Sequence, residues 1–185
     1  MWIAIGLLVA LVLIALFVIG TYNGLVGKRN RYKNAYAQID VQLKRRYDLI
    51  PNLVETVKGY AAHEKGTLDA VIQARNSAVA AANSDPAARA QAESAVTATL
   101  GRLFALAEAY PNLKANENFA ALQGELSNTE DKIAYSRQFY NSAVQTLNGA
   151  VQSIPTNIIA GMGGFRIEPY FEAIGDERQD VSVRF

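Results

Sequence analysis

An uninterrupted apolar run at the start of the chain constrains its fold more than any other feature. From Trp2 to Ile19 every residue is apolar or glycine, and no charge interrupts the run. An α-helix rises about 1.5 Å per residue, so Trp2 to Tyr22 would span about 30 Å, the hydrocarbon thickness of a bilayer. Because a helix satisfies its backbone hydrogen bonds internally, it is stable in lipid. The run predicts a transmembrane anchor over residues 1–22.

Two other structures could produce an apolar run, a buried core helix and a cleaved signal peptide. A core helix normally shows polar positions, and this run shows none. A signal peptide carries a positively charged start and a small-residue cleavage site. No positive side chain precedes the run, and residues 19–23 form a poor cleavage site. We therefore expect an uncleaved anchor.

Positive charge is concentrated directly after the apolar run. Residues 23–49 carry seven Lys and Arg against two Asp, whereas residues 50–185 carry eleven Lys and Arg against fifteen Asp and Glu. Lys and Arg close to a span favour its cytoplasmic side. We expect a single-pass membrane protein, with Met1 outside and the soluble domain in the cytoplasm.

The basic residues nearest the anchor are also candidates for contact with lipid. Positive side chains at a membrane surface attract anionic headgroups. The alternative is that these charges only set the topology. The candidate headgroup contacts are Lys28, Arg29, Arg31 and Lys33.

Residue types that carry catalysis or bind metals are scarce. The chain has no Cys and a single His, His63, which excludes disulfides, thiolate metal sites and multi-histidine metal sites. His63-Glu64 lacks the second His of a zinc protease, and Gly161–Gly164 follows no predicted strand, as a nucleotide-binding loop would. We expect no enzymatic activity, cofactor or metal. No nucleic-acid partner is expected, because the basic cluster adjoins the membrane and the rest of the chain is acidic.

Apolar side chains recur at helical spacing through most of the remaining chain. One clear stripe contains Phe119, Leu126, Ile133, Tyr140 and Val144. Such stripes bury one face of each helix against its neighbours. We predict an all-α fold: a transmembrane helix over 1–22, an antiparallel bundle of about four long helices over 23–153, and an irregular or extended tail over 154–185.

Prolines mark the expected ends of these helices. Ser84-Asp85-Pro86 predicts a capped helix start, and Ser153-Ile154-Pro155 predicts a helix end. Pro51 could begin a helix capped by Asp48 or kink a continuous one, because the apolar spacing runs through it. We favour a break, since Pro51-Asn52-Leu53 recurs as Pro111-Asn112-Leu113.

The residues around both prolines are predicted helix junctions at one end of the bundle or at a bend. They could form a contact surface, or they could serve only packing and capping. The junction residues are Tyr47, Asp48, Pro51, Asn52, Tyr110, Pro111 and Asn112.

Two features predict a homo-oligomer. Ten alanines lie between residues 78 and 98, and alanine favours helix and lets helices approach closely. Residues 181–185 alternate apolar and polar side chains, as an edge strand or a docking peptide would. The alternatives are a simple helical hairpin and a tail packed on its own domain. The predicted assembly residues in the tail are Val181, Val183 and Phe185.

Several motifs in order make the chain resemble the LemA family of bacteria. They are the stretch over residues 37–54, His63-Glu64, Ala74-Arg75, the stretch over 108–119, and Arg137-x-x-Tyr140-Asn141. The resemblance implies a membrane-anchored bundle of about four helices, an N-terminus outside the membrane and no established catalytic activity. Family members associated with magnetosome membranes imply a role in membrane organisation. One departure is Thr146-Leu147-Asn148, which keeps only Asn148 of an aromatic-Asn pair.

The leading hypothesis is a non-enzymatic, self-associating scaffold whose partners are membrane lipids and further copies of itself. The alternative is a signalling or adaptor module that binds a membrane protein partner through its helical face or its tail. The size of the oligomer distinguishes the two hypotheses.

Overall fold

The computed structural model describes residues 1–171, and every regular element in that part of the chain is helical. The elements are α1 (Trp2–Lys58), α2 (Lys65–Ala80), the 3-10 turn η1 (Ala81–Asn83), α3 (Pro86–Ala107), α4 (Pro111–Lys114), α5 (Glu117–Gln152) and α6 (Thr156–Met162). The predicted all-α fold with one long apolar N-terminal helix is confirmed for these residues.

The chain folds into two compact units, and the long helices α1 and α5 contribute to both. Unit 1 comprises residues 1–37 and 137–169, which hold the start of α1, the end of α5, and α6. Unit 2 contains residues 38–136, which hold the end of α1, all of α2, α3 and α4, and the start of α5. Each unit has its own core.

Unit 1 has a small apolar core next to the first part of α1. Leu25, Leu147, Ile159, Ala160 and Phe165 are buried against one another. The residues of α1 that precede this core are long and apolar enough to cross a membrane, by length and composition. Residues 2–19 are all exposed in the structure. The apolar side chains that the sequence places in an anchor are therefore open to a surrounding solvent or lipid.

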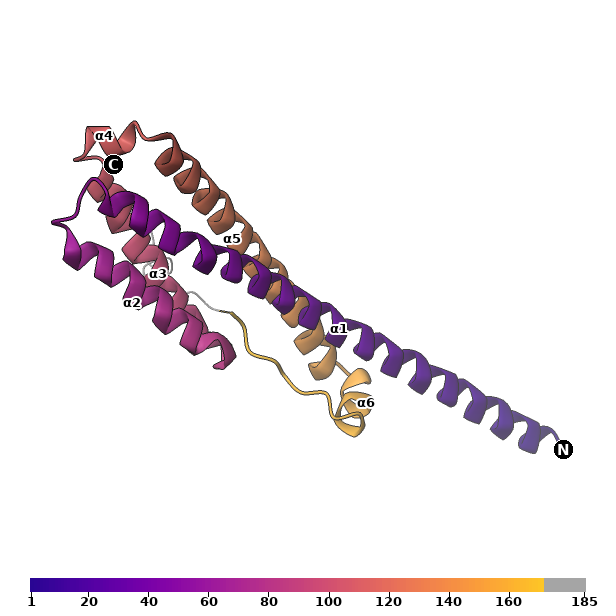
Figure 1. Ribbon diagram of the computed structural model, residues 1–185. Helices are drawn as coiled ribbons and strands as arrows, with labels where there is room; N and C mark the ends of the chain where they lie inside the picture. The colour runs from indigo at the N-terminus through magenta and orange to yellow at the C-terminus, as the bar shows by residue number, and fades with distance from the viewer. Residues whose placement is uncertain (172–185) are drawn as a thin grey trace, which may run out of the picture. The chain divides into compact units, whose positions relative to one another are not determined.

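In unit 2 the consecutive long helices run antiparallel to one another (Figure 1). Their apolar stripes meet in the interior. The buried apolar side chains include Ile39, Leu43, Ile50, Leu53 and Val57 of α1, Leu68 and Val71 of α2, Val96, Leu100 and Leu103 of α3, and Phe119, Leu126 and Ile133 of α5. The helical spacing read from the sequence thus identifies the core faces of all four helices.

Two helix boundaries agree with the punctuation of the sequence. The Asp85 side chain accepts hydrogen bonds from the backbone N–H groups of Ala87 and Ala88, each at 3.0 Å, and Pro86 is the first residue of α3. The helix α5 ends at Gln152, immediately before Ser153-Ile154-Pro155. Both predicted boundaries are confirmed.

The predicted break at Pro51 is wrong, because α1 continues through it to Lys58. A proline inside a helix offers no N–H to the carbonyl four residues earlier, here that of Tyr47. The Nε of Arg75, on α2, donates to this Tyr47 oxygen at 3.1 Å. Because another helix replaces the missing donor, the proline costs less than it would alone. The chain reverses at residues 59–64, between α1 and α2.

The short helix α6 lies within the segment predicted as an irregular tail, and the sequence spacing does not predict it. Its Ile159 and Ala160 are buried in the core of unit 1, which offsets the poor helical tendency of Gly161. The helix ends before Gly163. Gly164 has φ +68°, a left-handed conformation that glycine adopts without strain.

Candidate functional site

A network of charged side chains is buried inside unit 2. Arg46 of α1 is only 1% exposed. Its guanidinium donates to Glu93 of α3, to the Thr97 hydroxyl at 3.0 Å and to Glu130 of α5 at 2.6 Å. The Tyr47 hydroxyl also donates to Glu93. One guanidinium therefore ties α1, α3 and α5 together.

The Tyr47 phenol of this network is neutral at neutral pH. Burial raises the pKa of the Tyr47 phenol well above its ordinary value, and the hydrogen bond to Glu93 and the charge of that carboxylate raise it further. Tyr47 therefore stays neutral and donates a hydrogen bond to Glu93. Buried charges are tolerated only when paired and hydrogen-bonded. The arrangement fits a structural device that holds three helices in register.

Two further ion pairs connect the same helices. Arg89 of α3, 3% exposed, lies 2.6 Å from the carboxylate of Asp40 on α1. Arg45 of α1 pairs with Glu125 of α5, and both of these side chains are partly exposed. The Asp40 side chain is 49% exposed, so this pair joins a buried guanidinium to a carboxylate at the surface.

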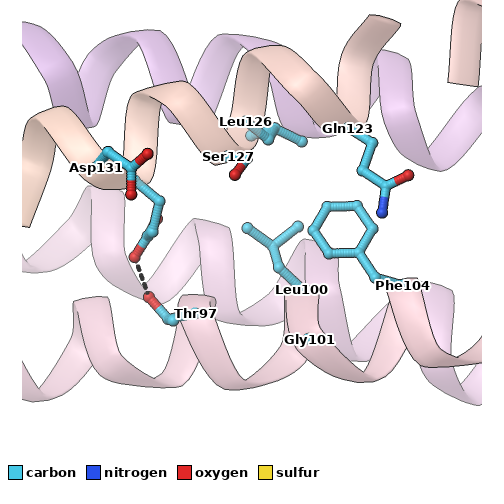
Figure 2. Close-up of a pocket in the computed structure, with 9 residues that line it drawn as sticks. Thr97, Leu100, Gly101, Phe104, Gln123, Leu126, Ser127 and Asp131 are labelled. Carbon is cyan, nitrogen blue, oxygen red and sulfur yellow. Dashed lines mark hydrogen bonds between the residues drawn. The ribbon is translucent and has the colours of Figure 1, made fainter. Parts of the chain in front are cut away.

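A groove of about 310 Å³ lies between α3 and α5 (Figure 2). Leu100, Phe104 and Leu126 form its apolar part. Glu130 and Asp131 form its acidic part, where the Thr97 hydroxyl donates to Glu130 at 2.7 Å. Apolar surface beside carboxylates can accept a side chain that is apolar along its length and positive at its end.

The described residues, 1–171, contain no cluster of side chains that could bind a metal ion. No three His, Cys, Asp or Glu side chains in this part of the chain lie close enough to hold an ion. His63 is exposed, and its neighbour Glu64 accepts a hydrogen bond from the Tyr110 hydroxyl at 3.0 Å. In the structure His63-Glu64 belongs to the turn between α1 and α2.

The predicted headgroup-contact residues lie on α1 within unit 1. The Arg29 guanidinium lies over the Phe165 ring, 4.9 Å from its centroid, and Arg31 lies over the Phe139 ring at 5.4 Å. Cation–π contacts of this kind orient a guanidinium without neutralising it. Lys33 is exposed and Lys28 is half-buried.

The first group of predicted junction residues lies in the interior of α1. Tyr47 is buried, and Asp48 is exposed and pairs with Lys44 at 2.8 Å. Pro51 and Asn52 continue the helix. The expectation that Asp48 caps a helix is wrong, because no helix begins there. Its carboxylate instead forms an ion pair with Lys44 on the surface of α1.

The second group lies where α3, α4 and α5 meet. Tyr110 precedes α4, Pro111 is the first residue of α4, and Asn112 is exposed. The capping role expected among these junction residues belongs to Asn116, just before α5. Its side-chain oxygen accepts a hydrogen bond from the Phe119 N–H at 2.9 Å. An Asn directly before the acidic first turn of α5 was the signal that could have identified it.

Hydrogen bonds connect this second group with the turn between α1 and α2. Tyr110 donates to Glu64, and the Asn116 amide donates to the Tyr60 hydroxyl at 2.9 Å. Both contacts join residues far apart in sequence within unit 2. The junction thus holds two helix connections together at the same end of this unit.

Three side chains in unit 1, which we call the clamp, hold the segment that follows α6. Tyr32 donates to the Glu168 carboxylate and Tyr140 donates to the Pro169 carbonyl, both at 2.9 Å. Asn148 donates to the Glu168 carbonyl and accepts from the Glu168 N–H, again at 2.9 Å. Burial raises the pKa of Tyr140 to about 12, so its hydroxyl stays a donor. The Asn148 side chain therefore binds both backbone groups of Glu168.

The predicted assembly residues Val181, Val183 and Phe185 lie outside the described residues. Phe165 and Phe171, which precede them, are 6% and 1% exposed. Removing these two rings would damage the units themselves. A test of the tail must therefore begin after Phe171.

Comparison with known proteins places the chain in a family. The model of the LemA family matches residues 35–185. Protein LemA of Metamycoplasma hominis is 27% identical over 165 residues, which covers 89% of this chain and 75% of that protein. Magnetosome protein MamQ 2 of Paramagnetospirillum magneticum and Magnetosome protein MamQ of Magnetospirillum gryphiswaldense are each 26% identical, over 82% and 81% of this chain. The chain spans 64% of the length of each of these two magnetosome proteins. Since the family model covers most of its residues, the chain belongs to the LemA family.

Proposed function

We propose that this chain is a membrane-anchored, non-enzymatic scaffold that self-associates at the bacterial inner membrane and organises or remodels that membrane. The observation that carries the proposal is the continuity of α1. One helix contains both an unburied apolar segment long enough to span a bilayer and the first helix of the bundle in unit 2. Such a helix joins an anchor to a folded body without a loop between them.

The interior of unit 2 supports a structural role. Arg46 and Tyr47 both donate hydrogen bonds to the Glu93 carboxylate, and none of these three residues lines the groove between α3 and α5. A catalytic group would instead face a cavity that substrate can enter. Two relatives are named magnetosome proteins, and a role in membrane organisation for this chain draws on that likeness.

The basic residues of α1 support the proposed membrane side and the proposed partners. Lys28, Arg29, Arg31 and Lys33 follow the apolar segment, and the next Asp or Glu is Asp40. Anionic lipid is the ligand that suits this cluster. The soluble part then lies in the cytoplasm, and Met1 lies outside.

Chemical crosslinking in native membranes tests self-association. The full-length protein should give a ladder of homomeric products, because a shared membrane raises the effective concentration of the copies. A chain ending at Phe171 and the full-length triple variant Val181→Ser/Val183→Ser/Phe185→Ser should both lose the ladder if the tail connects the copies. The triple variant is the matched control, since it keeps the length and charge of the tail. Monomer alone from the full-length protein would refute the scaffold.

An adaptor that binds a membrane protein partner is the second candidate, and the groove between α3 and α5 favours it. The same experiment separates the two candidates. An adaptor should crosslink to a different protein and show no homomeric ladder, and Asp131→Lys, at an exposed acidic position of the groove, should remove that product.

A further inference from the structure

Exposed apolar side chains gather on α6 and directly before it, in unit 1. Ile154 is 83%, Ile158 62% and Met162 85% exposed. Ile158 and Met162 are four residues apart on α6, so they share one face of this helix, and Ile154 lies in the turn directly before it. Soluble proteins seldom leave several large apolar side chains together in water, and such a patch marks a contact with a partner or a membrane.

The apolar surface of α6 continues onto the apolar segment of α1. A pocket of about 410 Å³ lies between them, and its lining includes Val18, Ile19 and Tyr22 of α1 together with Ile158 and Met162 of α6. The rings of Tyr22 and Phe165 meet edge to face with centroids 5.7 Å apart. Figure 1 shows α6 beside the first half of α1. Whatever surrounds this part of α1 therefore also reaches α6.

The position of α6 along α1 matches the edge of a bilayer. The apolar run ends at Ile19 and the first charged residue is Lys28, nine residues later. That interval is about 14 Å of helix, so the boundary between hydrocarbon and headgroups lies within it. The pocket touches residues 18–23 of α1, at the apolar end of this interval. The Arg29 guanidinium over Phe165 marks the polar end.

Several contacts fix α6 at this level. Ile159 and Ala160 are buried in the core of unit 1. The clamp holds the segment after α6 through Glu168. Gly163 permits the close approach, because a Cβ there would lie 2.8 Å from the Phe165 ring and 3.1 Å from the Tyr22 ring. The exposed side chains of α6 therefore have a defined depth relative to α1.

We infer that α6 is a second membrane contact, an interfacial helix whose Ile154, Ile158 and Met162 insert among the acyl chains at the leaflet from which α1 emerges. The inference rests on the proposed membrane anchoring of α1. Lipid is the occupant because the patch is continuous with the segment that lipid would surround, and because Lys28 and Arg29 lie where anionic headgroups begin. The protein then contacts the leaflet over an area wider than a single helix.

The absence of Cys from the chain makes the test direct. Single variants Ile158→Cys and Met162→Cys are labelled with an environment-sensitive fluorophore in the full chain, reconstituted into vesicles of phosphatidylcholine and phosphatidylglycerol. Quenching is measured with spin-labelled lipid and with aqueous iodide. Leu11→Cys, in the apolar run, is the reference for a lipid environment. Gln138→Cys, exposed on α5 in the same unit, is the reference for an aqueous environment.

Labels at 158 and 162 should be quenched by the spin-labelled lipid and protected from iodide, as the label at position 11 should be. The label at position 138 should be quenched by iodide and not by the spin-labelled lipid. Quenching by iodide at 158 and 162 would overturn the inference, and so would protection from both quenchers, which would mean a protein cover. Absence of lipid quenching at Leu11 would instead refute the proposed anchoring itself. Unchanged circular dichroism and unfolding midpoints should confirm that the labels, placed on exposed side chains, leave the fold intact.

Discussion

Among single residues, Arg46 and Arg45 show how burial changes the free-energy cost of a charge that loses its partner. The two arginines are adjacent on α1, yet the Arg46 side chain is 1% exposed and that of Arg45 is 49% exposed. Each pairs with a glutamate on another helix. A buried charge that loses its partner keeps the cost of leaving water, whereas an exposed charge is rehydrated.

This contrast predicts unequal effects of two Glu→Ala variants. Glu93→Ala should lower the free energy of unfolding by about 3–5 kcal/mol, because the buried Arg46 keeps only the partly exposed Glu130 as an ionic partner and the Tyr47 hydroxyl loses its acceptor. Glu125→Ala should lower it by at most about 1 kcal/mol, because Arg45 can turn to solvent. Denaturant unfolding of the full chain in detergent, followed by circular dichroism, measures both. Equal losses would show that the network in unit 2 is not isolated from water.

The buried tyrosines predict a loss of stability at alkaline pH. The pKa of Tyr140 is raised from 10.0 to about 12 by burial, with contributions from Tyr36 and Glu168. Since the folded state holds this proton more tightly than the unfolded state, the stabilisation is complete below pH 10 and is lost as the pH rises through about 12. Burial also raises the pKa of Tyr47, which acts in the same direction.

Unfolding midpoints measured across this alkaline range should therefore fall with pH. Tyr140→Phe should make the fall less steep, and Tyr135→Phe, at a side chain 70% exposed, should leave it unchanged. A flat midpoint in the wild-type chain would contradict the assignment of buried, neutral tyrosines.

At the scale of elements, α1 depends on α2 for its continuity. The helix carries Pro51 in its interior, and the carbonyl of Tyr47 would lack a donor without Arg75. A buried carbonyl left unpaired costs about 1–3 kcal/mol. One side chain from the neighbouring helix thus decides whether α1 is a single long helix or two helices.

A double-mutant cycle tests this dependence. Arg75→Met should lower the free energy of unfolding by about 1–3 kcal/mol in the chain with Pro51. In the Pro51→Ala background the loss should be smaller, because the Ala N–H can bond the Tyr47 carbonyl within the helix. Unfolding of the four proteins in detergent gives the coupling energy directly. Additive effects would mean that Arg75 stabilises the chain through contacts unrelated to Pro51.

At the scale of the whole molecule, positive charge is confined to one side of the apolar run. No Lys or Arg precedes Lys28, and four lie between residues 28 and 33. In each unit the side chains form their own hydrogen-bonded groups, the clamp in unit 1 and the Arg46 network in unit 2. The continuous helix α1 contributes to both units, so the proposed orientation of the anchor applies to both of them.

This charge asymmetry predicts the topology. Asn118→Cys, at an exposed position of α5 in unit 2, should resist a membrane-impermeant maleimide in intact spheroplasts and react after permeabilisation. Replacing Lys28, Arg29, Arg31 and Lys33 together by Gln should give a mixed population, part of it labelled from outside. Full labelling of Asn118→Cys in intact spheroplasts would place the soluble part on the opposite side.

Features that depend on neighbours close along the chain could be predicted from the amino-acid sequence. The apolar run, the buried stripes of the long helices and the Asp85-Pro86 helix start follow from helical periodicity and from capping within three residues. The family likeness followed from motifs that span most of the chain. These features needed no knowledge of which helices touch.

Features that depend on partners distant in sequence could not be predicted and are seen only in the folded chain. Pro51 remains helical because of a donor at Arg75, Asn148 binds the backbone of Glu168, and α6 forms because Ile159 packs against Leu25 and Leu147. In each case the partner lies at least 12 residues away along the chain, and spacing along the chain does not record such contacts.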